Sequence, residues 1–253
     1  MNFEKLRMQA ANNTPVLIKG SASASVATYE RISRTQEAIA STKDNRKFIL
    51  ATPFGKQPVN LDWLPGAAET YSISADPNDF VICDVPLVSV DIPNRNCQAF
   101  PYEEVSYFDP QQGQLVYKTF IGKPTFINHD NRDPKKAKGV NFDASLVWIP
   151  KYKIWKIRVL SGFDRTKDKD LAEAILKGKR PFFSMAALVS DFVCSVCGKT
   201  DTQINPCKHI RDMKGNIVDN SIVYQLCIGA TYAENSNVDT AADPTAESDN
   251  ILS

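Results

Sequence analysis

Short apolar stretches alternate with polar turns along much of this 253-residue chain. Between about residues 47 and 127, the apolar stretches are rich in β-branched and aromatic residues. Pro, Asn, Asp and Gly separate them, which is the pattern of strands and turns. The clearest stretches are residues 47–52 (KFILAT), 80–90 (FVICDVPLVSV) and 114–121 (QLVYKTFI). We therefore expect short strands over this region.

Longer apolar stretches follow in the second half of the chain. Residues 145–160 (SLVWIPKYKIWKIRVL) predict two strands that meet at Pro150, because lysines interrupt a β-branched and aromatic run there. Residues 182–194 (FFSMAALVSDFVC) and 221–232 (SIVYQLCIGATY) predict buried strands. Together these patterns predict an α+β chain that is mainly β.

The clearest helix is predicted in the segment KDKDLAEAILKGKR. Asp168 or Asp170 can cap its N-terminus, and Leu171 and Ile175 share one apolar face. Gly178 is placed to end the helix, because glycine adopts the left-handed conformation at a helix C-terminus without strain.

The two ends of the chain differ in composition from its body. Residues 1–45 are rich in Ala, Ser, Thr, Asn and Gln, which favours a flexible or partner-docking N-terminal segment. Residues 46–238 carry the apolar stretches and form the predicted domain. The polar residues 239–253 predict a mobile C-terminal tail.

Charge and hydropathy exclude several classes of protein. The 30 basic and 29 acidic residues give a net charge of +1, which argues against nucleic acid or an anionic membrane as the main partner. No apolar run approaches the roughly 18 residues of a membrane span. The N-terminus is too charged for a secretory signal, so we expect a cytoplasmic protein with reduced or metal-bound cysteines.

Four residues have the spacing of a zinc site. Cys194 and Cys197 form a Cys-x2-Cys pair, and Cys207 and His209 follow after nine residues. Gly198 permits the tight turn of a knuckle. The set predicts a structural zinc in a small hairpin insert at residues 194–209, because four protein ligands leave no position for water.

The remaining cysteines are assigned more simply. Cys227 is an alternative to His209 as the fourth ligand. Cys83 and Cys97 are expected to be buried apolar residues.

The candidates for nucleophilic chemistry are Ser184 and two histidines, His129 and His209. A serine hydroxyl needs an imidazole within hydrogen-bond reach to accept its proton. Residue types and spacing alone do not pair Ser184 with either histidine, and no Gly-x-Ser-x-Gly elbow surrounds it.

A resemblance to a known family decides between these options. The segments GKPTFINHD, AEAILKGKRPFFSMAALVSDF and YAENSNVDTAADPTA occur in this order within about residues 120–246. The order is similar to that of the motifs of viral prohead proteases, the head-maturation serine proteases of tailed bacteriophages. These are related in fold to herpesvirus assemblins, and the cysteine-rich insert resembles that of some T4-like and jumbo phage members.

The resemblance implies roles for individual residues. His129 would be the general base and Ser184 the nucleophile, with Glu234 as the third catalytic residue. Asp219 and His209 are rivals for the third role. Herpesvirus relatives use a second histidine, which would suit His209. Asp219 would lie across from Ser184 if the strands formed a hairpin whose paired residue numbers sum to about 403.

The resemblance also implies a barrel-like core with surrounding helices for the protease domain. It predicts an endopeptidase that cleaves capsid and scaffold proteins in the immature phage head, in the host cytoplasm. T4-like members cut after Glu at Ala-x-Glu-like sites, so self-cleavage is expected, with Glu247 in the tail as the leading position. Basic residues that could bind a substrate Glu are Lys177, Lys179, Arg180 and Arg211. The alternative is a non-catalytic, zinc-stabilised structural or binding module of the phage head.

Overall fold

The computed structural model describes residues 1–11, 13, 15–23, 47–52, 55–150, 152–180 and 182–239. Residues 240–253 of the predicted C-terminal tail, including Glu247, lie outside these residues, as does most of the predicted N-terminal segment. Within the described part of the chain, no helix is both long and apolar enough to cross a membrane.

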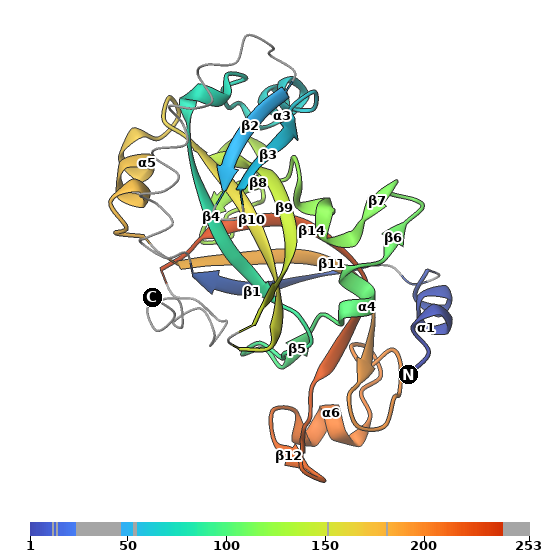
Figure 1. The fold of residues 1–253 in the computed structure, drawn as a ribbon. Coiled ribbons are helices and arrows are strands. Elements are labelled where there is room, and N and C mark those ends of the chain that lie inside the picture. The colour runs from blue at the N-terminus through green and yellow to red at the C-terminus, as the bar shows by residue number, and fades with distance from the viewer. Residues whose placement is uncertain are drawn as a thin grey trace.

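One mixed eight-stranded sheet forms the body of the molecule (Figure 1). Its order is β1-β11-β14-β8-β9-β10-β4, with β5 paired to β14 beside this path. Its strands are β1 (Val16–Ser23), β4 (Phe80–Ser89), β5 (Gln98–Ala99), β8 (Pro124–Ile127), β9 (Gly139–Ile149), β10 (Ile154–Asp164), β11 (Phe182–Cys194) and β14 (Gln225–Asn237). Only the β14–β8 and β14–β5 pairs are parallel, and the other pairs are antiparallel.

Helices and two-stranded hairpins surround this sheet. The described helices are α1 (Phe3–Ala10), α3 (Leu64–Tyr71), α4 (Tyr102–Val105), α5 (Lys169–Leu176) and α6 (Lys208–Met213), with short 3₁₀ turns at Pro77–Asp79, Val116–Phe120 and Pro134–Lys136. The hairpins are β2 (Lys47–Thr52) with β3 (Gly55–Asn60), β6 (Phe108–Asp109) with β7 (Gln114–Leu115), and β12 (Ile217–Val218) with β13 (Ser221–Ile222). The prediction of a mainly β, α+β chain is therefore confirmed.

The predicted barrel-like core is wrong in one respect, because the sheet does not close. A closed barrel needs a continuous hydrogen-bonded ladder around its circumference. Among the described residues, the path of paired strands ends at β1 on one side and at β4 on the other. The sheet is therefore open, and β1 and β4 are its edges.

Several predicted elements are confirmed and two regions differ. Strands occupy 80–89, both halves of 145–160 and all of 182–194. The predicted strand at 114–121 is wrong beyond Leu115. There the chain turns into a 3₁₀ helix that buries Val116 and Phe120. In the N-terminal segment, β1 pairs over all eight residues with β11.

The hydrophobic core lies on one face of β11. Phe183, Met185, Ala187 and Val189 alternate along this strand and are all buried in the main core. Successive strand residues point to opposite faces, so Ser184 lies on the other face.

Helix α5 leads the chain into β11. The Asp168 carboxylate accepts a hydrogen bond from the backbone N–H of Leu171 at 3.0 Å, which confirms Asp168 as the cap. Gly178 follows the helix at a φ of 66°, a left-handed conformation that favours glycine. The predicted helix and its two end signals are thus confirmed, and they fix where β11 begins.

Candidate active site

Ser184 sits near the start of β11, on the strand face opposite the main core. Its cross-strand partner on β14 is Ser236, and on the other side it pairs with Ser21 of β1. The residue is only 5% exposed. The strand therefore holds the Ser184 hydroxyl in a nearly closed position between two neighbouring strands.

A β-bulge in β14 brings Glu234 to the same face as Ser184. Ala187 pairs with Tyr232 but Ala186 pairs with Glu234, so Ala233 is an extra residue. Tyr232 points into the core, where its ring stacks on Phe120 at 4.0 Å. Without the extra residue in the strand, side-chain alternation would turn Glu234 inward as well. The bulge reverses the alternation, so the Glu234 side chain lies on the same face of the sheet as Ser184, opposite the main core.

His129 reaches the site from the other side of β14. Strand β8 runs parallel to β14, with Ile127 paired to Asn237, and the chain turns immediately afterwards. Asn128 and His129 have φ values of 49° and 57°, and the N–H of Asp130 donates to the carbonyl of Ile127 at 3.0 Å. Asn and His are among the residues that tolerate this left-handed backbone. The tight turn directs the imidazole back over β14.

These three side chains form one hydrogen-bonded chain. Nε2 of His129 lies 2.5 Å from Oγ of Ser184, and Nδ1 lies 2.5 Å from Oε1 of Glu234. The side chains of His129 and Glu234 are 13% and 2% exposed. The nearly dry surroundings strengthen these polar contacts relative to water. The structure thus brings together three residues that are spread over 105 positions of the sequence, from His129 to Glu234.

A fourth residue, Ser236, completes the polar cluster. Its hydroxyl donates to Oε2 of Glu234 at 2.6 Å and accepts a hydrogen bond from the backbone N–H of His129 at 3.3 Å. Ser236 lies in the segment YAENSNVDTAADPTA, but no residue pattern in that segment predicted a role for it. Its position two residues after Glu234 on one strand was the available signal, because such residues share a face.

The two rivals for the third position lie elsewhere. Asp219 is exposed in the turn between β12 and β13, and His209 lies in α6 beside three cysteines. The pairing on which Asp219 depended is wrong. The β11–β14 pairs have numbers that sum to 419 or 420, because the connection between these strands is longer than a simple hairpin tip.

A second polar group lies next to the hydrogen-bonded chain of Ser184, His129 and Glu234 (the triad). The Asp239 carboxylate accepts hydrogen bonds from Asn128 Nδ2 and from the Arg180 guanidinium, both at 2.9 Å. The Asn128 bond and then the Arg180 charge hold the pKa of Asp239 below its usual range. Arg180 also donates to the side chain of Asn237. These contacts connect Asn128, which precedes His129, and Asn237, which follows Ser236, through Arg180 and Asp239.

The other basic candidates for substrate binding lie in different surroundings. Lys177 pairs with Glu173 on the surface of α5, and Arg211 pairs with Asp212 in α6. Among the described hydrogen bonds and ion pairs of Lys177, Arg211 and Arg180, only those of Arg180 reach a side chain of β14, that of Asn237.

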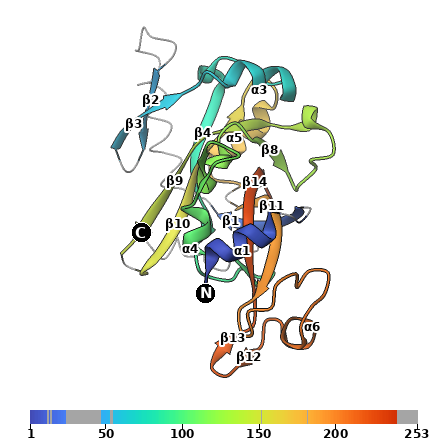
Figure 2. The same cartoon turned by 90° about the vertical axis from the view of Figure 1, so that its right-hand side faces the viewer.

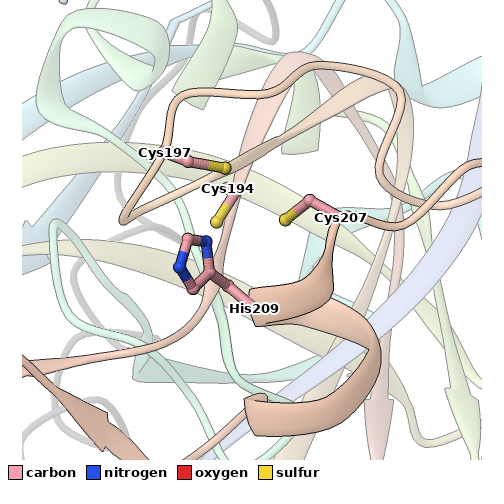
Figure 3. A group of neighbouring side chains, drawn as sticks. All are labelled: Cys194, Cys197, Cys207 and His209. Carbon is pink, nitrogen blue, oxygen red and sulfur yellow. The ribbon is translucent and has the colours of Figure 1, made fainter.

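The predicted zinc ligands gather at the far end of the β11–β14 hairpin. The ligand atoms of Cys194, Cys197, Cys207 and His209 all lie within 4.8 Å of one another. Figure 3 shows the His209 ring turned toward the sulfur atoms. The chain turns tightly after Cys194, with the Gly198 N–H donating to the Cys194 carbonyl at 3.0 Å and a φ of 69° at Gly198.

The cluster has two further features of a metal site. Nδ1 of His209 is buried and has no hydrogen-bond partner among the described atoms, so a cation would satisfy its lone pair. Burial raises the pKa of Cys207. Hydrogen bonds from the backbone N–H of Ile210 and from the neighbouring thiols outweigh the effect of burial and lower the pKa of Cys207 to about 7, which favours the thiolate. Burial raises the pKa of Cys194 to about 11.

The other three cysteines lie outside this group. Cys227 is fully buried on β14, and burial raises its pKa well above the ordinary value. Cys83 is buried in the main core as expected. Cys97 differs from the prediction, because it is only partly buried and lies in a turn at a φ of 53°.

The segment between β11 and β14 is a small unit of its own. Residues 195–224 contain α6, β12 and β13, which project from the end of the two strands (Figure 2). Cys194, Ile210 and Val223 form a core separate from the main one. At about 3.3 Å per residue, the ten residues from Ser184 to Cys194 span about 30 Å. The cluster and the triad therefore occupy opposite ends of one hairpin.

No protein-family model matches this chain, and no curated protein matches its sequence. Among solved structures, the fold is similar to that of the capsid assembly protease of bacteriophage T4. The TM-score is 0.41 and the sequence identity is 14%, over 90% of this chain and 100% of that chain.

Proposed function

We propose that the protein is a serine endopeptidase with Ser184 as nucleophile, His129 as general base and Glu234 as the residue that orients His129. The observation that carries this proposal is the continuous hydrogen-bonded chain from Ser184 through His129 to Glu234. This is the geometry that serine hydrolases on unrelated folds share.

The contacts suggest the following mechanism. Nε2 of His129 accepts the Ser184 hydroxyl proton as Oγ attacks the carbonyl carbon of a peptide bond. The imidazolium then gives this proton to the amine nitrogen as the C–N bond breaks, which leaves an ester on Ser184. Water, deprotonated by His129, hydrolyses the ester and regenerates the hydroxyl. The Glu234 carboxylate stabilises the imidazolium in both steps.

The proposed substrates are capsid and scaffold proteins of an immature phage head, in the host cytoplasm. This assignment rests on the order of the three motifs around His129, Ser184 and Glu234. Cleavage after Glu, and self-cleavage after Glu247, belong to the same proposal. Arg180 is the basic residue best placed to bind a substrate Glu, because it already holds the Asp239 carboxylate. A substrate carboxylate would replace Asp239 there.

We further propose that Cys194, Cys197, Cys207 and His209 hold a structural zinc ion. Zn–S distances of about 2.3 Å and Zn–N distances of about 2.0 Å imply ligand atoms about 3.5–3.8 Å apart in a tetrahedron. Their spread of up to 4.8 Å needs only a small contraction to reach this geometry. Four protein ligands suit a structural role, with the metal fastening the insert.

The test is cleavage of a co-expressed protein that carries Ala-x-Glu sites, read by intact mass. We expect Ser184→Ala and His129→Ala to lose cutting by about 10⁶-fold, the scale seen when either residue of such a triad is removed. The thermal midpoint of Ser184→Ala should stay close to that of the wild type. The masses of the products report the cleavage motif and any loss of the tail after Glu247.

Ser190→Ala is the matched control. Ser190 lies on the same strand six residues away, and its hydroxyl bonds the Gly229 carbonyl at 3.3 Å, outside the triad. It should cut like the wild type. If folded Ser184→Ala cuts as well as the wild type, or the wild type cuts nothing, the proposal fails. The alternative of a non-catalytic, zinc-stabilised structural or binding module then stands.

A further inference from the structure

Ser236 holds a position that the proposed triad alone does not explain. It is fully buried, and it is the cross-strand partner of Ser184. Its single hydroxyl contacts both the Glu234 carboxylate and the backbone of His129. The Ser236 hydroxyl therefore contacts both His129 and Glu234, the two members of the triad other than the nucleophile.

The direction of these hydrogen bonds follows from the chemistry of the groups. A backbone N–H can only donate, so Ser236 Oγ accepts from His129. The hydroxyl proton of Ser236 is then available to Oε2 of Glu234, 2.6 Å away. A carboxylate is an acceptor on both oxygens, so Oε1 accepts the Nδ1 proton of His129. Nε2 is left without a proton and can accept one from Ser184.

These contacts form a closed ring that begins and ends at His129. The ring runs from the His129 backbone to Ser236, to Glu234 and back to the His129 imidazole. The first contact also stabilises the left-handed backbone of His129, at a φ of 57°, a conformation that costs energy for any residue except glycine. The ring therefore couples the backbone conformation of His129 to the tautomer of its side chain.

We propose that Ser236 is a positioning residue that fixes both the rotamer of Glu234 and the Nδ1–H tautomer of His129. This inference rests on the proposed serine–histidine chemistry for its consequence, although the tautomer itself does not depend on any activity. Removing the hydroxyl leaves Oε2 without this donor in a buried site, and the carboxylate then gains from rotating toward other donors. His129 loses its fixed acceptor and the Nε2–H tautomer becomes populated.

The test uses the fact that the chain has only two histidines. The full chain is labelled with ¹⁵N-histidine, and the ring nitrogens are recorded over a series of increasing pH until the spectra no longer change. His129→Gln assigns the signals. We expect the Nδ1–H form of His129 in the wild type and in Ser190→Ala. In Ser236→Ala a mixture with the Nε2–H form should appear, while the His209 signals stay unchanged.

Kinetics give a second readout. Ser236→Ala should lower kcat by up to about 10²-fold with KM within about twofold, the effect of a misplaced catalytic group rather than of weaker substrate binding. Ser236→Thr keeps the hydroxyl and should recover most of kcat if it melts like the wild type.

Two tautomer results would overturn the inference. One is an unchanged Nδ1–H tautomer in Ser236→Ala. The other is the Nε2–H form in the wild type. Both are readable in a protein that cuts nothing, so the failure of this inference and the failure of the proposed protease function are distinguishable. A normal kcat in Ser236→Ala would also contradict it.

Discussion

The triad and the cysteine–histidine cluster stand at opposite ends of the same hairpin, yet they are built in different ways. The cluster draws its four residues from 16 consecutive positions, 194–209, and needs only a knuckle turn and one short helix. The triad draws residues from positions 129, 184 and 234. Ser184 and Glu234 lie on β11 and β14, and His129 lies in the turn just after β8, the other neighbour of β14. One site depends on local chain geometry, and the other depends on strand register.

This difference predicts that the two sites fail separately. Damage to the cluster should loosen the insert and leave the sheet intact, because Cys194, Ile210 and Val223 form a core of their own. Damage to the triad should remove chemistry and leave the insert intact. Three perturbations, in order of decreasing expected effect on kcat, test this separation.

The largest effect is expected from Glu234→Gln. The amide can no longer accept from Nδ1–H of His129 as a carboxylate does, and it cannot stabilise the imidazolium. We expect kcat to fall by about 10⁴-fold, as in other triads that lose the acid, with an unchanged zinc content. The measurement is steady-state cleavage of an Ala-x-Glu peptide. Asp219→Asn is the control, and equal losses in both variants would contradict the assignment of Glu234.

Metal withdrawal should act on the other end of the hairpin. Structural zinc in small domains contributes an apparent free energy of about 10–16 kcal/mol, so Cys207→Ser or a chelator should unfold the insert locally. We expect amide protection to be lost over residues 196–223 in hydrogen-exchange mass spectrometry. Because the triad lies about 30 Å away along the strands, kcat should fall by less than about tenfold.

Cys97→Ser is the matched control for this experiment, since Cys97 lies outside the cluster. It should retain one zinc per chain by elemental analysis. Absence of zinc from the wild type together with an insert that stays protected would identify the four residues as reduced cysteines and an ordinary histidine.

The smallest effect is expected from Gly198→Ala in the knuckle turn. A Cβ there would meet nothing within 4 Å, so the cost comes only from the left-handed backbone at a φ of 69°. We expect a loss of roughly 1–2 kcal/mol in the stability of the insert, seen as weaker zinc retention in a chelator titration. Gly66→Ala in α3 also meets nothing within 4 Å but has no positive φ, and it should be neutral or slightly stabilising.

The same contrast explains what the sequence could predict. The cluster and the end signals of α5 depend on residues within a few positions of one another, so spacing and propensity were enough. Ser184 and His129 were paired only through a resemblance. The choice of Glu234 over Asp219 depended on two features that no local pattern reveals. One is the length of the insert, which shifts the pairing sum, and the other is the bulge at Ala233.

The remaining errors have the same origin. The 114–121 stretch has strand-like composition, but its packing requires the 3₁₀ spacing that buries Val116, Thr119 and Phe120. Whether the sheet closes depends on whether β1 and β4, its two edge strands, form hydrogen bonds with each other. No residue pattern within either strand predicts this. Tertiary packing overrides local preference in both cases.

The central place of β14 in the sheet also sets an order of events during protein synthesis. This strand lies between β11 and β8, and it is the last strand of the described chain to leave the ribosome. A nascent chain that already contains Ser184 and His129 still lacks the strand that separates and aligns them. It also lacks Glu234 and Ser236. If Ser184, His129 and Glu234 act as proposed, the chain is expected to gain its hydrolytic activity only after β14 has been inserted into the sheet.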